Sequence, residues 1–186
     1  MKKTLVCLLL MFLLSGCSRN PDELEQALSL RSSLLQASQC SFTACIIADY
    51  GDQIASFSMD CGADSEGNVS FTIVEPDVIS GISGKLSEKA GQLIFEDTAL
   101  HFPLIADEQL SPVSAPWIFL KTLRSGFLTS ACRESDKIHL TLDDSYAEDA
   151  LTLDIWLNSF NQPERADILH NGRRILSVDV RNFEIL

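Results

Sequence analysis

Cysteine thiols are the most reactive side chains in this 186-residue chain, which contains six of them. Four lie in the body of the chain: Cys40, Cys45, Cys61 and Cys132. In an exported domain such a set favours disulfides, whereas in the cytosol it favours metal binding or catalysis. No two of the four form a Cys-x-x-Cys pair, and no histidine directly neighbours them. A zinc site is therefore not expected, because structural zinc ligands come in such close pairs.

The other polar residues form no recognisable catalytic motif. The sequence lacks a Gly-x-Ser-x-Gly elbow, a His-Glu-x-x-His pair and a phosphate-binding loop. All histidines fall within strand patterns, where a surface or strand-end position is expected: His101, His139 and His170. One loop is crowded with acidic residues but lacks the spacing and the glycine of a calcium loop: Asp143, Asp144, Glu148 and Asp149. We therefore expect a solvated acidic turn, no enzyme, no metal and no cofactor.

The first residues have the order of an export signal. Lys2 and Lys3 precede an apolar run from Leu5 to Leu14, and small residues then lead to Cys17. Charged, apolar and small-residue regions in this order are typical of a cleaved signal peptide. The apolar run is about half of the ~20 residues that a transmembrane helix needs, which favours cleavage over a membrane span.

The end of this segment, Leu14-Ser15-Gly16-Cys17, resembles the lipobox of bacterial lipoproteins. In that family the cysteine receives a diacylglyceryl group and becomes the first residue after cleavage. The resemblance implies a removed signal peptide over residues 1–16, a lipid-bearing Cys17 and a tether over residues 17–20. It implies a protein at the extracytoplasmic face of the cell membrane, attached to the membrane through its N-terminal lipid.

The charge of the mature chain excludes several kinds of partner. Loss of Lys2 and Lys3 leaves 12 Lys+Arg residues against 26 Asp+Glu, a net charge of −14. Nucleic acid is not an expected partner, because phosphate binding needs a basic surface. Attraction to anionic lipid is excluded for the same reason, so the lipid group must hold the protein. Residues 21–186 suit a single domain that lies in water.

Two helices are predicted. The first follows the tether, with Asn20 as its cap and Pro21 at its first position, and should end near Ser38. The second runs from about Ala115 to Ser125, and Gly126 suits its C-terminal end.

Most of the remaining chain alternates apolar and polar residues, as antiparallel strands with one buried face do. The alternating segments are 41–50, 54–61, 69–74, 93–95, 99–104, 138–142, 151–157 and 176–180. Val78–Gly84 is expected as a bent strand, Gln162-Pro163 as a turn and Asn171-Gly172 as a hairpin turn. The pattern predicts an α+β domain, in which two or three helices cover the concave face of a strongly curved antiparallel half-barrel.

This order of elements resembles the lipoprotein-carrier fold of LolA and LolB, an open antiparallel barrel lidded by helices. The resemblance rests on the capped helix before the first strand, on the Gly67–Pro76 passage and on the closing strand that ends Val180-Arg181-Asn182-Phe183. It implies one carrier-like domain over residues 21–186. Some lipid-anchored relatives with this fold carry cargo, and others act as partners of cell-wall enzymes.

The second predicted helix is apolar over most of its girth, whereas a surface helix has one apolar stripe. Its candidate ligand-binding residues, with one just beyond it, are Trp117, Phe119, Leu120, Leu123 and Phe127. Either the helix is sunk in the sheet as core, or it is a lid whose aromatics line a cavity for an acyl chain or apolar peptide. Trp156 falls on the polar side of its strand, where it can mark a partner surface.

Two functions therefore remain open. One is an extracytoplasmic binding protein that holds a lipid, an acyl chain or a lipidated cargo in an apolar half-barrel. The other is a non-catalytic scaffold that binds a cell-envelope enzyme.

The strand pattern also predicts a disulfide. If Asp49–Asp52 form a four-residue loop, Cys40 lies opposite Cys61 on the apolar face. A two-residue loop would shift the pairing by two, and the two cysteines would then be diagonal neighbours on the same face. Opposed residues have Cβ atoms ~4.5–5.5 Å apart, near the span of a disulfide. Cys45 has the opposite parity, so Cys132 is its predicted partner.

Substitution Cys17→Ser removes the thiol that the lipobox resemblance assigns to lipid attachment. We expect the precursor to stay unlipidated and to keep residues 1–16, because two acyl chains give the stable attachment that one alone does not. Gel mobility and labelling with radioactive fatty acid measure both effects. Processing and membrane fractionation that are unchanged by Cys17→Ser and by globomycin would show that the protein is not a lipoprotein.

Overall fold

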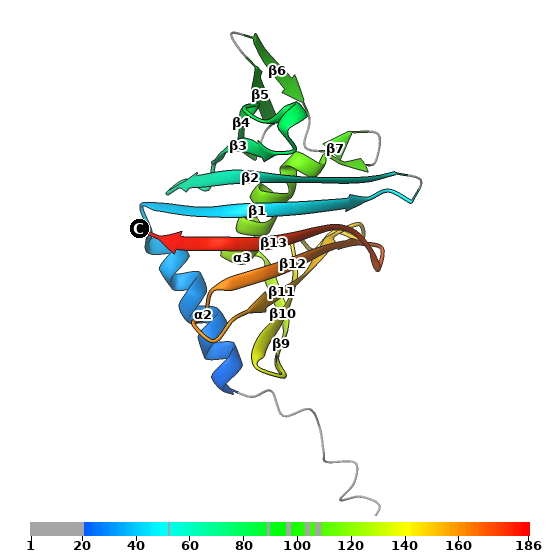
Figure 1. Cartoon of the computed structure of the whole chain (residues 1–186). Coiled ribbons are helices and arrows are strands. Elements are labelled where there is room, and N and C mark those ends of the chain that lie inside the picture. The colour runs from blue at the N-terminus through cyan, green and yellow to red at the C-terminus, as the bar shows by residue number, and fades with distance from the viewer. Residues whose placement is uncertain (1–20, 52, 89, 96–97, 103–104, 107–108) are drawn as a thin grey trace, which may run out of the picture.

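The computed structural model describes residues 21–186 except 52, 89, 96–97, 103–104 and 107–108 (Figure 1). The signal peptide, the tether and Cys17 lie outside the described residues, so lipidation stays a prediction. The helices are α2 (Pro21–Gln36) and α3 (Ala115–Ser125), and two short 3-10 turns are η1 (Asp77–Ile79) and η2 (Pro112–Ser114). Across the described ranges, no helix is both long enough and apolar enough to cross a membrane.

The other regular elements are strands. They are β1 (Gln39–Asp49), β2 (Ile54–Asp64), β3 (Val69–Glu75), β4 (Ser83–Leu86), β5 (Gly91–Phe95), β6 (Thr98–Phe102), β7 (Ile105–Ala106), β8 (Gln109–Leu110), β9 (Phe127–Glu134), β10 (Lys137–Asp143), β11 (Leu151–Leu157), β12 (Pro163–His170) and β13 (Arg173–Ile185). Eleven of them form one sheet in the order β6-β5-β4-β3-β2-β1-β13-β12-β11-β10-β9, and β7 pairs separately with β8.

The first and last strands lie side by side in the middle of the sheet (Figure 1). All pairings are antiparallel, and the carbonyl of Leu186 accepts hydrogen bonds from the backbone N–H groups of Ser38 (2.9 Å) and Gln39 (3.3 Å). The edges β6 and β9 stand at opposite ends of the strand order, so the sheet is open. The predicted α+β class, with an open antiparallel sheet and helices, is confirmed.

Alternation along the strands gives the sheet two different faces. In β11, Leu151, Leu153, Ile155 and Leu157 are buried, and the residues between them are half-buried. Successive side chains of a strand point to opposite sides, so one face becomes apolar throughout. We call this buried face the inner face and the opposite one the outer face.

Helix α3 packs against the inner face. Eight of its 11 residues are buried. Phe119 meets Phe42 of β1 edge to face, with ring centres 5.8 Å apart, and Phe42 lies 5.9 Å from Phe183 of β13. The helix and the two central strands therefore share one aromatic cluster, and the predicted bounds Ala115–Ser125 are confirmed.

Gly126 ends α3, but it does not adopt the left-handed conformation that glycine often has after a helix. The φ angle of Gly126 is −67°. A Cβ atom at this position would lie 2.6 Å from the carbonyl oxygen of Thr122 and 2.9 Å from that of Asp143. Glycine is needed here because the backbone of the helix end closely approaches β10.

Helix α2 is held by a short apolar row and by polar contacts. Its buried apolar residues are Ala27, Leu30 and Leu34. The buried Glu23 forms an ion pair of 3.1 Å with Arg133 of β9, and Asn161 donates to the carbonyl of Gln26 at 3.0 Å. These contacts fasten the helix to the β9 edge of the sheet and to the β11–β12 turn.

Arg31 connects the two helices. Its Nε donates to the Leu123 carbonyl and its Nη2 donates to the Gly126 carbonyl, each at 2.9 Å. Both carbonyls belong to the C-terminal end of α3, where the helix dipole favours a cation. Burial lowers the pKa of this guanidinium from its ordinary value.

Three segments differ from their predicted structure. Only Ser83 and Gly84 of the predicted strand Val78–Gly84 belong to a strand, because η1 and a turn at Gly81, with φ of +87°, precede β4. Pro163 begins β12 instead of lying in a turn. The edge strand β9 was not predicted, because its largely exposed side chains give no alternating apolar pattern. The hairpin at Asn171-Gly172 is confirmed, with φ angles of 51° and 74°.

Substitution Arg31→Met tests the connection between the helices. It leaves two carbonyl groups without their charged donor, and we expect the free energy of unfolding to fall by about 2 kcal/mol. Urea denaturation followed by circular dichroism measures this change. Lys85→Met is the matched control on an exposed side chain of β4, where about 0.5 kcal/mol or less is expected. Equal effects of the two substitutions would contradict the role of Arg31.

Candidate functional site

The residues predicted to bind a ligand on α3 lie in or beside the core. Phe119 is 0% exposed, Leu120 1%, Leu123 2% and Trp117 8%. The first three contact the protein's own side chains within one hydrophobic cluster. They belong to the packed core, which is the first of the two interpretations given above for this helix. Their side chains therefore do not face an open cavity as those of a lid would.

Phe127 lies elsewhere. It is the first residue of β9 and faces Asp143 across the strand pair, on the outer side of the sheet. Its ring packs on Tyr146 of the β10–β11 loop, with ring centres 3.6 Å apart. Phe127 therefore does not join the aromatic residues of α3, because the chain turns from helix to strand at Gly126.

A hollow of about 690 Å³ adjoins α3 on its solvent side. Trp117 and Lys121 line it, and the Lys121 ammonium lies 5.2 Å from the centre of the indole ring. Arg124 lines it as well and donates from Nη2 to the Ser65 carbonyl at 2.7 Å. The β2–β3 and β4–β5 turns contribute the carboxylates Glu66 and Glu88. Sequence analysis did not identify this hollow, because four separate segments form it.

An exposed apolar row runs along α2 toward this hollow. Leu24 is 38% exposed, Leu28 50% and Leu35 55%. Spacings of four and seven residues bring the three side chains to one side of a helix. We call them the α2 stripe. Leu35 also lines the hollow beside Trp117, so the stripe and the hollow form one continuous surface.

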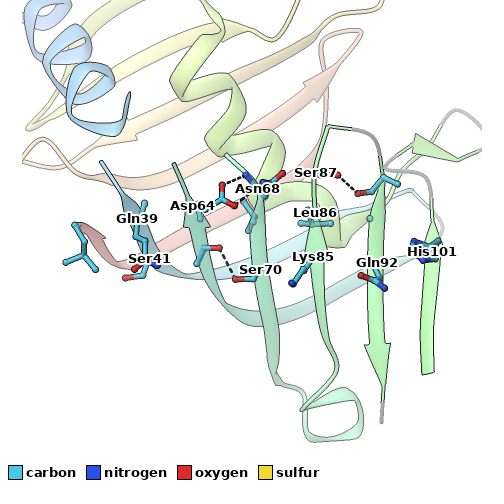
Figure 2. A pocket seen from close by; sticks show the side chains of 17 residues that line it. Gln39, Ser41, Asp64, Asn68, Ser70, Lys85, Leu86, Ser87, Gln92 and His101 are labelled. Carbon is cyan, nitrogen blue, oxygen red and sulfur yellow. Dashed lines mark hydrogen bonds between the residues drawn. The ribbon is translucent and has the colours of Figure 1, made fainter. Parts of the chain in front are cut away.

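A second hollow, of about 680 Å³, lies across one end of β1–β6 (Figure 2). Residues in register on the outer face of six strands line it: Ser41, Gly62, Ser70, Lys85, Gln92 and His101. Their hydroxyl, amide, ammonium and imidazole groups can form hydrogen bonds with the polar part of a ligand.

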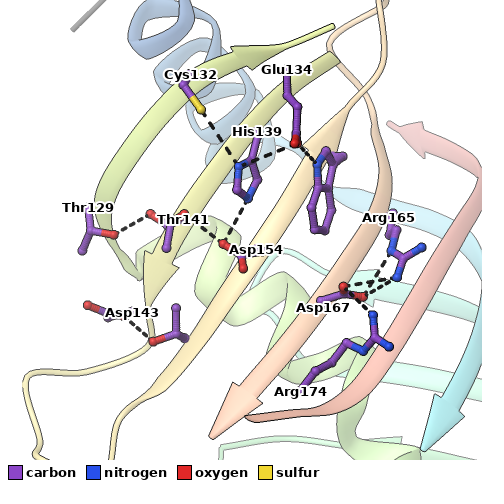
Figure 3. A network of polar contacts seen from close by, with 12 residues as sticks. Thr129, Cys132, Glu134, His139, Thr141, Asp143, Asp154, Arg165, Asp167 and Arg174 are labelled. Carbon is purple, nitrogen blue, oxygen red and sulfur yellow. Dashed lines mark hydrogen bonds and ion pairs between the residues drawn. The ribbon is translucent and has the colours of Figure 1, made fainter. Parts of the chain in front are cut away.

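Trp156 lies on the outer face, as predicted, within a network of polar contacts (Figure 3). His139 stacks on its indole with ring centres 4.7 Å apart, and the Arg165 guanidinium lies 5.6 Å from the ring centre. The indole N–H donates to Glu134 at 2.7 Å. Neighbouring strands therefore cover the indole, which is half-buried, and it is not a free platform for a partner.

The acidic loop after β10 makes local contacts. Asp143 accepts a hydrogen bond from the Thr152 hydroxyl at 2.8 Å, and Asp144 accepts one from the Leu151 backbone N–H at 2.9 Å. Within the residues that the structure describes, no group of three or more histidines, cysteines and carboxylates is placed to hold a metal ion.

The predicted register of the first hairpin is wrong, because each residue of β1 faces a residue of β2 two positions later than predicted. β1 runs to Asp49 and β2 starts at Ile54, so Cys40 faces Ala63 and Cys61 faces Phe42. The two cysteines share the inner face but are diagonal neighbours. The Cα atoms of diagonal neighbours are ~7–8 Å apart in an ordinary sheet, beyond the usual Cα separation in a disulfide. Both are free thiols.

The predicted partners Cys45 and Cys132 are far apart. Both lie on the outer face as free thiols, but β13, β12, β11 and β10 separate their strands. Five steps of about 4.8 Å each put them more than 20 Å apart, which no disulfide can bridge. Parity along the chain places a residue on a face of the sheet, but it does not say which strands are neighbours.

The inner-face thiols of Cys40 and Cys61 are held in their unreactive, protonated form. Burial raises the pKa of the Cys40 thiol to about 12, and the charge of Arg124 partly opposes this shift. Burial, with smaller contributions from Asp60 and Cys40, raises the pKa of the Cys61 thiol still further. Because the thiolate is the nucleophile, both groups are unreactive at neutral pH.

No family model and no curated protein matches the sequence. Among solved structures, a LolA superfamily protein of Nitrosomonas europaea is 11% identical, with a TM-score of 0.46, over 86% of this chain and 93% of its own. The Mycobacterium tuberculosis lipoprotein LppX is 9% identical, with a TM-score of 0.42, over 87% and 93%. A chain from the complex of the Clostridioides difficile CwlD amidase with the GerS lipoprotein is 12% identical, with a TM-score of 0.43, over 92% and 99%. Likenesses of this degree establish neither a family nor a function.

Because the inner-face thiols are buried, we expect the cysteines of the folded protein to differ in their reaction with an alkylating reagent. At pH 8, iodoacetamide should label the exposed Cys132 and leave Cys40 and Cys61 unmodified until urea is added. Mass spectrometry of tryptic peptides, without reduction, measures this pattern. A peptide linked through Cys40 and Cys61 would contradict the observed register, and a peptide linked through Cys45 and Cys132 would contradict the strand order.

Proposed function

We propose that this protein is a non-catalytic, lipid-anchored interaction module that binds another protein of the cell envelope. One observation supports this function over carriage of a lipid inside the sheet: α3 occupies the inner face, and Phe119 at its centre is 0% exposed. A carrier needs an apolar cavity of several hundred Å³. Polar side chains contribute to the lining of both large hollows.

The α2 stripe with the hollow beside Trp117 is the proposed contact surface. From Leu24 to Leu35 the stripe extends over about 16 Å of helix. Binding energy at protein interfaces concentrates where apolar or aromatic anchors enter pockets. An apolar helix or loop of the partner can lie along the stripe while one of its side chains enters the hollow.

The rim of the hollow provides specificity. Lys121 and Arg124 stand on the α3 side, and Glu66 and Glu88 stand on the turns. Charged groups around an apolar centre set the orientation of a partner and its association rate more than its affinity. We therefore expect the partner's anchor to be flanked by charges of both signs.

The position of α2 in the chain supports a partner at the membrane surface. If Cys17 carries lipid, four residue steps join it to Pro21, and a chain of that length reaches at most ~14 Å. The α2 stripe then lies close to the bilayer, where envelope enzymes with membrane anchors are available.

Protein is a better occupant of the stripe than the bilayer itself. Asp22 and Glu25 are exposed at the start of α2, and the whole chain carries a net charge of −12. An anionic membrane surface repels such a helix, because juxtamembrane binding depends on lysine and arginine. Leucines that are exposed at a cost in water are therefore better explained by a protein partner.

Site-specific photo-crosslinking in cells tests the proposal. With photoreactive benzoylphenylalanine in place of Leu28, we expect one discrete adduct with an envelope protein, and none from the same group in place of Ile54. Ile54 is the matched control, because it is 72% exposed and lies on β2, away from α2. Affinity of the purified pair then gives the magnitude: Leu28→Glu should weaken binding by about tenfold or more, and Ile54→Glu should not.

Three outcomes would contradict the proposal. Adducts with lipid alone would assign the stripe to the bilayer. Equal adducts from positions 28 and 54 would show non-specific contact. Unchanged affinity of the Leu28→Glu variant for the crosslinked protein would move the interface to another surface.

Binding of a hydrophobic ligand is a second candidate function, which the hollow favours. Leu35 and Trp117 can contact an acyl chain while Lys121 and Arg124 face an anionic head group. Titration with a fluorescent fatty acid tests it, with Leu35→Glu as the variant, because Leu35 is 55% exposed and the fold does not depend on it. Saturable binding that Leu35→Glu abolishes would support a ligand-binding function. The absence of saturable binding would exclude it and leave the interaction module.

A further inference from the structure

Three side chains of the outer face form a Cys–His–Asp relay that the proposed function does not use (Figure 3). Cys132 of β9 faces His139 of β10 in register, and its Sγ lies 4.0 Å from the imidazole Nδ1. The other ring nitrogen, Nε2, lies 3.0 Å from Oδ1 of Asp154 on β11. A nucleophile, a base and a group that orients the base are thus connected in one line across three strands.

Asp154 determines which nitrogen of His139 can accept a proton. A carboxylate only accepts hydrogen bonds, so Nε2 carries the hydrogen and Nδ1 keeps its lone pair. The Thr141 hydroxyl donates to the same oxygen at 2.9 Å and fixes the carboxylate. Trp156 stacks on the imidazole with an angle of 8° between the rings, which fixes the ring plane. The free lone pair therefore belongs to the nitrogen nearer Cys132.

Carboxylates lie beside both nitrogens of the imidazole. From β9, Glu134 places Oε2 4.0 Å from Nδ1, and from β11, Asp154 lies at Nε2. On β10 itself, Lys137 is paired with Glu164 at 2.9 Å. Transfer of the thiol proton to Nδ1 thus creates a cation between two carboxylates.

From this geometry we propose that Cys132 is a thiol–disulfide exchange site for small organic disulfides, R–S–S–R, with His139 as its base. Nδ1 takes the proton of the Cys132 thiol, and the thiolate attacks one sulfur of the disulfide. A Cys132–S–S–R bond forms as the S–S bond of the reagent breaks. The released RS⁻ takes the proton from the imidazolium and leaves as RSH. The organic disulfide is the oxidant, so atoms and electrons balance.

Disulfide exchange fits this site better than acyl transfer does. Acyl transfer requires hydrogen-bond donors that stabilise an oxyanion, whereas the group that faces this space is the carboxylate of Glu134, which donates no hydrogen bond. Exchange needs a thiolate, a leaving thiolate and access for the reagent. Cys132 is exposed on an edge strand, so a small disulfide can approach it from solvent.

The test follows mixed-disulfide formation on purified full-length protein with the uncharged probe 2-hydroxyethyl disulfide. Mass spectrometry of the Cys132 and Cys45 peptides gives the rate at each thiol in one sample. We expect His139→Ala to slow modification of Cys132 by about tenfold or more, leave Cys45 unchanged, and recover most of the rate on addition of imidazole. His101→Ala, which removes a histidine from the outer face of β6, is the matched control and should change neither rate.

Asp154 acts as a positioning residue, and a double-mutant cycle separates this role from a structural one. Asp154→Asn should slow Cys132 in the native sequence but have no further effect in the His139→Ala background. If His139→Ala does not fold, His139→Gln replaces it in the same scheme. A Cys132 rate that His139→Ala leaves unchanged, or that falls together with the Cys45 rate, would overturn the proposal. A slower rate that imidazole does not restore would also overturn it, because the histidine would then only support the strand pair.

Discussion

The structure depends on covering the apolar inner face of one large antiparallel sheet. Alternation along the central strands of this eleven-stranded sheet produces the face, and α3 covers it with eight buried residues. Phe119 joins the helix to Phe42, and Phe42 joins Phe183 of the last strand. Because interiors are packed as densely as organic crystals, the buried side chains of α3 also support the packing of the sheet against the helix.

Helix α2 differs from α3 in how it is held. Polar contacts fix it at both ends: Glu23 pairs with Arg133, and Arg31 donates to the carbonyls that end α3. These directional contacts fix the rotation of the helix, and that rotation turns Leu28 and Leu35 to solvent. An apolar stripe that polar contacts keep exposed is available for association. It adjoins a hollow that Trp117 and several charged side chains line, and this hollow can receive a side chain of a partner.

On the outer face, strand pairing alone brings reactive side chains together, without a cavity around them. Cross-strand neighbours stand close together on each face, and their side chains form a ladder across the strands. Cys132, His139, Trp156 and Arg165 are successive members of one such ladder. Hydrogen bonds to carboxylates in the adjoining positions fix the orientation of the planar groups. The thiol at the exposed end of the ladder is thereby placed against a base, whereas the buried thiols of the inner face are protected.

Local patterns in the sequence determined most of the elements: the two helices, the alternating strands, the Asn171-Gly172 turn and the class of fold. They depend on residues a few positions apart, whose spacing decides the pattern. Strand order and register depend on contacts between distant segments, and only the tertiary structure decided them. A loop placed one residue too early put Cys40 opposite Cys61, because a hairpin changes its register by two residues for each residue of loop shift. The approach of Cys132 to His139 and Asp154, the burial of Phe119 and the hollow beside Trp117 likewise arise from pairing and packing across the chain, which no local period records.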